Sequence, residues 1–354
     1  MLKDYDLNKI VEPLLQWFSN NARVLPWRDD NRPYRVWVSE IMLQQTRVEA
    51  VKPYFERFMK ELPDVADLAT CPQDKLLKLW EGLGYYNRVR NMQEAAQTVV
   101  EQYGGVLPSD PDKLLELKGI GSYTAGAIAS IAYQVPIAAV DGNVLRVITR
   151  VSADTNDITK QAFKTQMEHL LGEVIPKDTP GAFNQALMEL GAMVCIPNGA
   201  PLCDRCPWNT ICEARKQNLI SQIPVKAKKK PRTIEDLTVM VIKDNDRIIL
   251  NKRPEHGLLA GLYELPNLPG HLSEQEVLEY VRKKNLIPIR ILEVENAKHI
   301  FTHKEWHMKG YVINVASEEE HPEFVGRDEV NRLYSIPSAF SAYMKYMTKK
   351  PMEP

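Results

Sequence analysis

The sequence predicts two domains of different class, an all-helical one over residues 1–220 and a mixed α/β one over residues 234–354. A chain of 354 residues is longer than one hydrophobic core usually supports, and its 44% hydrophobic residues allow both parts to fold. Up to about Leu219 the apolar residues recur at helical spacing, whereas later ones form short strand-like runs. The basic segment between them, residues 221–233, is predicted to be a linker.

Each part shows its pattern in particular segments. Helical spacing is clearest in KLLKLWEGL, RNMQEAAQTVVEQY and FNQALMELGAMV, which proline and glycine residues separate. The linker has almost no large apolar side chain and carries cations that could touch phosphate, namely Lys226, Lys228, Lys229, Lys230 and Arg232. In the second part, LTVMVI and RIILNKR flank a DND turn, SEQEVLEYVRKK predicts a helix, and AKHIFTH and GYVINVA predict further strands.

Composition gives little direct information about partners. A formal net charge of −1 and a pI near 6.7 provide no bulk attraction to nucleic acid, so any DNA binding must come from local patches and oriented backbone amides. No apolar run approaches the roughly 20 residues of a membrane span. The N-terminal residues enter an amphipathic helix without a signal peptide. We therefore expect a soluble, cytoplasmic protein.

Four cysteines close the helical part: Cys195, Cys203, Cys206 and Cys212. Paired zinc knuckles need two short Cys-x-x-Cys pairs, and this segment has one such pair flanked by single cysteines. The spacing therefore favours a 4Fe-4S cluster over zinc. A disulfide framework is a weaker alternative, because thiols in a reducing cytosol are more often metal ligands. The fifth cysteine, Cys71, is predicted to be a packing residue.

The segment SDPDKLLELKGIGSYTAGAIASIAY predicts a helix-hairpin-helix with its tight turn at Gly119 and Gly121. Glycines let the backbone approach a phosphate, and the amides that begin the second helix point toward it. This arrangement is typical of DNA backbone binding that does not depend on sequence. An ordinary helical corner is the alternative for the two glycines alone.

Asp141 directly precedes a predicted helix with apolar residues at Val144, Val147, Ile148 and Val151. Taken alone, it is an N-cap. Val140 and Gly142, on either side of it, place the Asp141 carboxylate at a constricted, apolar surface. There it could also stabilise the positive charge that develops on a sugar. The local sequence leaves both interpretations open.

Glu40 shares one helical stripe with Trp37, Ile41 and Gln44 in YRVWVSEIMLQQTRVEAV. Burial raises the pKa of a carboxyl group, so Glu40 could keep a proton at neutral pH and donate it to a leaving base. The alternative is a structural Glu that binds a neighbouring helix end.

Together, several ordered motifs resemble the adenine DNA glycosylases (the MutY family) of the helix-hairpin-helix and endonuclease III superfamily. They are LPWR at residues 25–28, WVSEIMLQQT at 37–46, EGLGYY at 81–86, LKGIGSYTA at 117–125, VDGNV at 140–144 and the four cysteines. The resemblance extends over the helical half, and the second half is similar to the family's MutT-like (Nudix-related) domain. It implies removal of adenine that is mispaired with 8-oxoguanine or guanine, after the base has been flipped from the duplex.

The resemblance also assigns the chemistry. Glu40 would protonate the purine at N7, Asp141 would stabilise the oxocarbenium-like sugar and assist water, and Asn143 would orient the site. Tyr123 stands where bifunctional relatives carry Lys, and because a phenol cannot form a Schiff base, the expected enzyme is monofunctional.

By the same resemblance, further residues contact the DNA or the base. Arg23, Leu25, Trp27 and Gln185 would line the adenine pocket, and Arg28 and Thr46 belong to the same motifs. Gln45 and Tyr85 would enter the duplex beside 8-oxoguanine. Core packing is the alternative for Trp27 and Tyr85 taken singly.

The second domain lacks the REx-x-EE arrangement with which Nudix hydrolases hold metal ions, so it is expected to recognise 8-oxoguanine rather than hydrolyse a nucleotide. The recognition loop of the family, FSH, corresponds to Phe301, Thr302 and His303, and Thr302 keeps a hydroxyl but adds a methyl group. A second departure is the segment between Cys195 and Cys203, which is one residue longer than usual in the family.

Three other functions compete with this interpretation. A thymine or oxidised-pyrimidine glycosylase of the endonuclease III type could share the helical scaffold and the cluster. A non-enzymatic DNA-binding or redox-sensing module would leave Glu40 and Asp141 without a role. A free-nucleotide hydrolase is disfavoured by the missing metal-binding glutamates.

Overall fold

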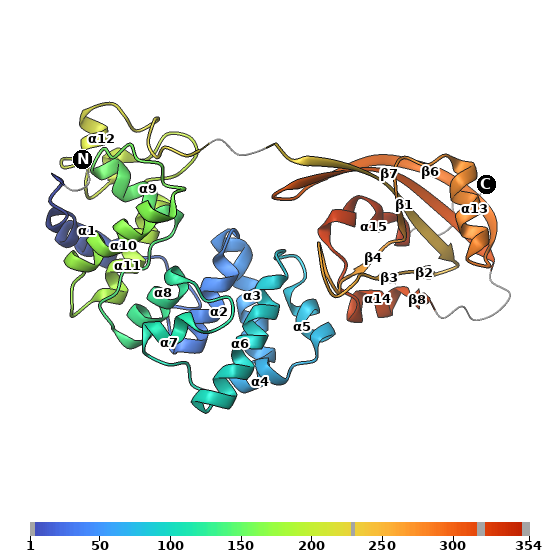
Figure 1. Cartoon of the computed structure of the whole chain (residues 1–354), viewed down its shortest axis with the longest axis horizontal. Coiled ribbons are helices and arrows are strands. Elements are labelled where there is room, and N and C mark those ends of the chain that lie inside the picture. The colour runs from blue at the N-terminus through green and yellow to red at the C-terminus, as the bar shows by residue number, and fades with distance from the viewer. Residues whose placement is uncertain (1–3, 228–230, 317–322, 349–354) are drawn as a thin grey trace. The chain divides into compact units, whose positions relative to one another are not determined.

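The computed structural model describes residues 4–227, 231–316 and 323–348 (Figure 1). The chain divides into two compact units, a helical unit of residues 1–71 and 88–228, and a sheet-containing unit of residues 72–87 and 229–354. Three of the predicted linker cations, Lys228, Lys229 and Lys230, lie outside the described residues.

The helical unit confirms the all-helical prediction for the first half of the chain. Its α-helices are α1 (Asn8–Asn21), α2 (Pro33–Leu43), α3 (Val48–Glu61), α4 (Val65–Thr70), α6 (Asn87–Tyr103), α7 (Pro111–Leu115), α8 (Ser122–Tyr133), α9 (Gly142–Val151), α10 (Gln161–Val174), α11 (Pro180–Met193) and α12 (Glu213–Lys216). A short 3-10 helix, η2 (Cys203–Arg205), lies among the cysteines. The helix pair α7 and α8 forms the predicted hairpin, with Gly119 at φ +79° between them.

A large hydrophobic core lies between α1, α9, α10 and α11. The apolar residues predicted on one face of α9, including Val144, Val147 and Ile148, are all buried in it. Trp208, next to the cysteines, is also buried there and donates through Nε1 to the carbonyl of Ile10 at 3.0 Å. The same packing therefore supports both the beginning of α9 and the cysteine segment.

The sheet-containing unit is α/β, as predicted. Its strands are β1 (Thr233–Asp244), β2 (Arg247–Ile249), β3 (Asn251–Lys252), β4 (Tyr263–Glu264), β5 (Asn267–Pro269), β6 (Ile287–Ile300), β7 (Lys304–Ala316) and β8 (Phe324–Gly326). The main sheet has the order β6-β7-β1-β2-β8, and β5 also pairs with β1. Strands β1 and β7 are parallel, whereas the other pairs are antiparallel.

Alternation along β1 gives this sheet a core on each face. Val239 and Val241 join one cluster, which includes residues of η3 (Ser338–Phe340) and α15 (Ser341–Thr348), while Met240 and Ile242 join the other, which includes residues of α13 (Glu274–Lys283). The predicted helix in SEQEVLEYVRKK is thus confirmed, and a capping box between Ser273 and Glu276 begins it.

One helical segment groups with the sheet rather than with the other helices. Helix α5 (Gln73–Trp80) contacts α14 (Arg327–Leu333), and Lys78 Nζ donates to the carbonyl of Tyr334 at 2.9 Å. The sequence suggests one contiguous helical part, whereas the structure groups residues 72–87 with the sheet-containing unit. The predicted boundaries at residues 220 and 234 remain predictions.

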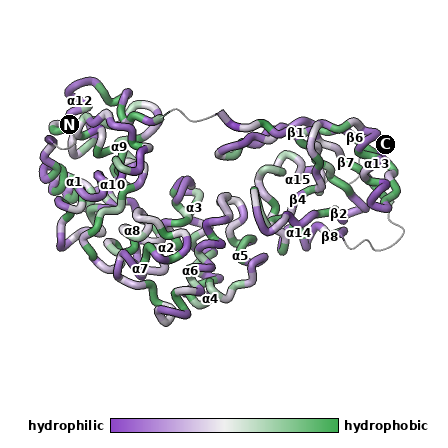
Figure 2. Tube along the Cα trace, in the orientation of Figure 1, coloured by the Kyte–Doolittle hydropathy of each residue, from purple (hydrophilic) through white to green (hydrophobic). Residues whose placement is uncertain are grey.

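Hydrophobic and hydrophilic stretches alternate along the tube throughout both units (Figure 2). Within the described residues, no helix is both long and apolar enough to cross a bilayer.

Candidate active site and cysteine pocket

A cavity of about 1180 Å³ opens in the helical unit, where α2, α8, α9 and α11 meet residues 23–28, residues 44–47 and the beginning of α3. It brings together predicted site residues that lie far apart in the sequence. Those that line it are Arg23, Leu25, Trp27, Arg28, Glu40, Gln45, Thr46, Tyr123, Asp141, Asn143 and Gln185. We call this cavity the reaction pocket.

Glu40 lies on α2 and is 6% exposed. Burial raises the pKa of its carboxyl group to about 7, and the nearby Asp141 carboxylate also raises it, whereas the Tyr123 hydroxyl and Arg28 act in the opposite direction. The Tyr123 hydroxyl donates a hydrogen bond to Glu40 Oε2. A carboxyl group that titrates near neutral pH can hold a proton and release it, so the geometry agrees with the general-acid interpretation.

Asp141 is both an N-cap and a residue of the reaction pocket. Its Oδ1 accepts from the backbone amides of Asn143 and Val144 at 2.8 Å each, and its Oδ2 accepts from Asn143 Nδ2 at 2.7 Å. Burial raises the pKa of Asp141, against the stabilising effect of these hydrogen bonds on the carboxylate. The two interpretations of the sequence are therefore compatible, because the cap fixes a carboxylate that faces the pocket.

A chain of hydrogen bonds leads from Asp141 toward the cysteines. Asn143, which binds Asp141, accepts at Oδ1 from Arg146 Nη2 at 2.9 Å. Arg146 Nε in turn donates to the backbone carbonyl of Cys195 at 2.8 Å. Arg146 was not predicted from the sequence; it lies on α9 between apolar residues and is almost fully buried.

Glu189 is a second site residue that was not predicted from the sequence. It lies on α11, is 2% exposed and lines the reaction pocket. Arg23 donates to it through Nε at 2.7 Å, and Arg28 donates through Nη2 at 3.0 Å. Burial raises the pKa of Glu189, but the hydrogen bonds from the two arginines outweigh burial and hold the pKa at about 2.

The same network fixes the orientation of Gln185, which lies one helical turn before Glu189. Arg28 Nε donates to Gln185 Oε1 at 3.0 Å. Because a guanidinium can only donate, the amide oxygen of Gln185 must face Arg28. The sequence does contain a pattern that could have indicated Glu189. Gln185 and Glu189 are polar residues at positions i and i+4 within the apolar run FNQALMELGAMV.

The hairpin turn requires glycine at one position. At Gly119, φ is positive, and an added Cβ would lie 2.7 Å from Asn91 Cβ, closer than real Cβ atoms approach. Gly121 is the N-cap of α8. Because it is a glycine, it has no side chain that could accept a hydrogen bond from the first backbone amides of that helix. This geometry suits a phosphate, as the sequence predicts, although phosphate binding itself stays a prediction.

Gln45 and Tyr85, the residues expected to enter the duplex, both have a left-handed backbone, with φ of 61° and 49°. Few residues other than glycine adopt this conformation, and strained residues cluster at functional sites. The Tyr85 side chain is 49% exposed. Both positions are therefore compatible with contact to a ligand, and neither is explained by core packing.

Phe301, Thr302 and His303 form the turn between β6 and β7, as the sequence predicts. The Phe301 ring packs edge-on against Trp306 with centroids 4.8 Å apart. Thr302 Oγ1 lies 3.2 Å from the Tyr85 hydroxyl, and both residues belong to the sheet-containing unit. The turn thus presents an exposed hydroxyl next to a predicted wedge residue.

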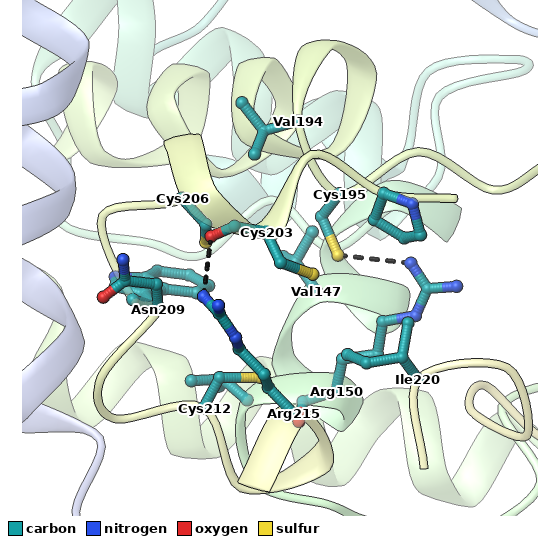
Figure 3. Close-up of a pocket in the computed structure, with 13 residues that line it drawn as sticks. Val147, Arg150, Val194, Cys195, Cys203, Cys206, Asn209, Cys212, Arg215 and Ile220 are labelled. Atoms are coloured by element: carbon teal, nitrogen blue, oxygen red, sulfur yellow. Dashed lines mark hydrogen bonds between the residues drawn. The ribbon is translucent and has the colours of Figure 1, made fainter. Parts of the chain in front are cut away.

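The four cysteines line a second pocket of the helical unit, and none of them is in a disulfide (Figure 3). We call it the cysteine pocket. Burial raises the pKa of the Cys206 thiol to about 12, and the other three cysteines add to this effect. Within the described residues, no group of three or more His, Cys, Asp or Glu side chains is arranged to hold a metal ion. The ligand set therefore stays a prediction. Cys71 is buried elsewhere, as expected for a packing residue.

Two family models match the chain. Residues 38–173 match the HhH-GPD superfamily base excision DNA repair protein, and residues 238–346 match the NUDIX domain. Adenine DNA glycosylase of Mus musculus is 36% identical, and the match covers 84% of this chain and 69% of the mouse protein. The relative of the same name in Buchnera aphidicola subsp. Schizaphis graminum is 32% identical, with 86% of this chain and 87% of the relative covered.

Solved structures support the fold of the helical part. A thermostable thymine-DNA glycosylase is similar with a TM-score of 0.54 and 28% identity, over 59% of this chain and 97% of that chain. A non-covalent endonuclease III–DNA complex is similar with a TM-score of 0.52 and 22% identity, over 62% and 98% of the two chains. At that identity, the second likeness shows the fold alone.

Proposed function

The chain belongs to the family of adenine DNA glycosylases, and we propose that it hydrolyses the N-glycosidic bond of adenine paired with 8-oxoguanine or guanine. The observation that supports this most directly is the meeting of Glu40, Tyr123 and Asp141 in one cavity. A partly desolvated acid and a carboxylate are the two groups that cleavage of a glycosidic bond through a cationic sugar requires.

Glu40 acts as the general acid. In a flipped adenine, it donates its proton to N7, so the base leaves as a neutral species when the bond from N9 to C1′ breaks. Tyr123 keeps the Glu40 carboxyl group in position through its hydrogen bond to Oε2. Because the pKa of Glu40 is about 7, protonated enzyme is available at neutral pH.

Asp141 acts on the sugar. Its carboxylate, held by the amides that begin α9 and by Asn143, stabilises the positive charge at C1′ and assists the attack of water there. The water oxygen bonds to C1′, its proton leaves through the carboxylate, and the products are free adenine and an abasic site. The side chain of Tyr123 is a phenol and has no amine that could form a Schiff base, so we propose a monofunctional enzyme.

Binding of mispaired DNA would use both units. The hairpin at Gly119 and Gly121 would bind the backbone, and Gln45 and Tyr85 would enter the duplex. The match to the HhH-GPD superfamily base excision DNA repair protein and the name of the relatives, adenine DNA glycosylase, support a DNA substrate. The turn at Phe301, Thr302 and His303 would recognise 8-oxoguanine, and Arg23, Leu25, Trp27, Arg28, Thr46 and Gln185 would surround the adenine.

We also propose a 4Fe-4S cluster as the cofactor. The donors fit it in their chemistry, because four soft thiol groups outside any disulfide line one pocket. Cys195, Cys203, Cys206 and Cys212 would hold the cluster, which would supply a four-point crosslink of this segment rather than a step in the hydrolysis. We further propose a cytoplasmic, nucleoid-associated monomer.

Single-turnover cleavage tests the function. Three duplexes, with A opposite 8-oxoguanine, A opposite G, and T opposite G, are assayed with and without alkali after the reaction. We expect breaks in the A strand only after alkali treatment. Breaks without alkali would contradict the monofunctional assignment, and activity confined to T opposite G would favour the thymine glycosylase that the competing interpretation predicts.

A further inference from the structure

Arg150 brings a buried positive charge to the cysteine pocket. It lies on α9, is 5% exposed and donates to Cys195 Sγ through Nη1 at 3.3 Å (Figure 3). The same Nη1 also donates to the carbonyl of Ile196 at 3.1 Å, and Nε donates to the carbonyl of Ile223 at 2.8 Å. The backbone carbonyl of Arg150 also accepts a weak hydrogen bond from the Cys212 thiol at 3.5 Å.

Among the described residues, no carboxylate forms an ion pair with this guanidinium. In the part of the chain that the structure describes, Arg150 forms hydrogen bonds to carbonyl oxygens and to sulfur, and no ion pair with Asp or Glu. An arginine stays charged in proteins, and a buried charge without an opposite partner is costly. The hydrogen-bond partner of Arg150 that can carry a negative charge is the Cys195 sulfur, which becomes anionic when it binds metal.

We propose that Arg150 is the counter-ion of the thiolate-bound iron-sulfur cluster and raises its reduction potential. This inference rests on the cluster of the proposed function. Reduction adds one negative charge to a cluster that thiolates already make anionic, and a buried cation beside a ligand sulfur favours the reduced form. Hydrogen bonds to ligand sulfurs and local charge are among the factors that set the potentials of such clusters.

Arg215 provides a matched control on the other side of the same pocket. It also lines the cysteine pocket, and its Nη1 donates to the backbone carbonyl of Cys203 at 3.1 Å (Figure 3). However, its Nη2 donates to Asp204 Oδ1 at 2.7 Å, and its side chain is 38% exposed. Its charge is therefore balanced and screened, so its removal should affect the cluster less.

The experiment compares purified holoproteins of the wild type, Arg150→Gln, Arg150→Lys and Arg215→Gln. Iron and sulfide contents are measured first, and the one-electron potential is then determined by voltammetry. We expect Arg150→Gln to shift the potential to more negative values and to lose iron faster to a chelator. Arg150→Lys, which keeps the charge, should shift it less, and Arg215→Gln should remain close to the wild type.

Unchanged potential in Arg150→Gln, or equal shifts in Arg150→Gln and Arg215→Gln, would overturn the proposal. If Arg150→Gln cannot retain iron, Arg150→Lys decides: iron retained with a potential near that of the wild type supports the role of charge, and loss of iron in both variants contradicts it. Absence of iron and sulfide from the wild type would instead refute the proposed cluster itself, so the two failures can be told apart.

Discussion

Two pockets of the helical unit contain arginines, Arg23 and Arg28 partly buried in one and Arg150 buried in the other, and the partners of these positive charges differ. In the reaction pocket, Arg23 and Arg28 share the carboxylate of Glu189. In the cysteine pocket, Arg150 has a sulfur atom and backbone carbonyls as its side-chain partners. The arginines of the reaction pocket therefore have a carboxylate of the protein beside them, whereas a metal-bound thiolate would provide the negative charge beside Arg150.

This difference predicts that the proton donor of the reaction pocket can be removed without disturbing the cysteine pocket. Glu40→Gln keeps the size of the side chain and an oxygen that can accept the hydrogen bond from Tyr123, but it cannot donate a carboxyl proton. We expect the single-turnover rate of adenine excision to fall by about 10²–10⁴-fold, the range typical of general acid catalysis. Duplex affinity and iron content should not change, and excision at the wild-type rate would exclude Glu40 as the acid.

Removal of the Glu189 carboxylate should leave the arginines of the reaction pocket without a carboxylate partner, as Arg150 is, among the described residues, in the cysteine pocket. Glu189→Gln leaves the partly exposed Arg23 and Arg28 without a carboxylate. Loss of one partner from a fully buried ion pair typically costs about 3–5 kcal/mol, and solvent at the two arginines should reduce this cost. The pKa of Glu189 is held at about 2 in the folded protein, so its contribution to stability is present above its ordinary pKa and disappears as pH falls toward 2. Denaturant unfolding should therefore show a deficit at pH 7 that shrinks in acid.

The same variant should change the pH dependence of catalysis. Glu40 is faced by Tyr123, by Asp141 and by Arg28, whose charge lowers the pKa of Glu40. With Glu189 neutral, the charge of Arg28 is no longer balanced, so the pKa of Glu40 should fall. The decline of the excision rate at high pH should then begin at lower pH than in the wild type. A pH profile that is merely scaled down would indicate a structural role for Glu189 only.

The sequence predicted those features that depend on neighbours in the chain. The hairpin at Gly119 follows from local glycine chemistry, and Asp141 from its position before an apolar helix. Glu40 was recognisable because an acid stood on a buried stripe. Glu189, Arg146 and Arg150 were missed, since each charge acquires its meaning only when distant segments meet, as when Arg150 reaches Cys195 and Ile223. The grouping of residues 72–87 with the sheet likewise depends on contacts between distant segments, such as that between Lys78 and Tyr334.

The raised pKa of Glu40 can also be tested through the pH dependence of the free energy of unfolding. Its pKa is about 7 in the folded protein and 4.5 in an ordinary environment, a difference worth about 3 kcal/mol at most. Because the folded pKa is raised, the stability present below pH 4.5 is lost as pH rises through 7. A Glu40→Gln variant cannot ionise, so it should be more stable than the wild type at pH 8 and lose this advantage at pH 4. Parallel pH–stability curves would contradict the buried, protonated acid.

The smallest effect is expected for Tyr123→Phe, and its sign is opposite to that of Glu189→Gln. The Tyr123 hydrogen bond lowers the pKa of Glu40, so its removal should raise that pKa and extend excision to higher pH. One neutral hydrogen bond contributes about 0.5–1.5 kcal/mol, so the rate at pH 7 should fall by roughly 10-fold or less. The pH–rate profiles of the two variants should shift in opposite directions, which simple loss of packing cannot produce. Shifts in the same direction would show that Tyr123 and Arg28 do not set the pKa of Glu40. They would also show that the carboxylate of Glu189 matters less to the reaction pocket than its ion pairs suggest.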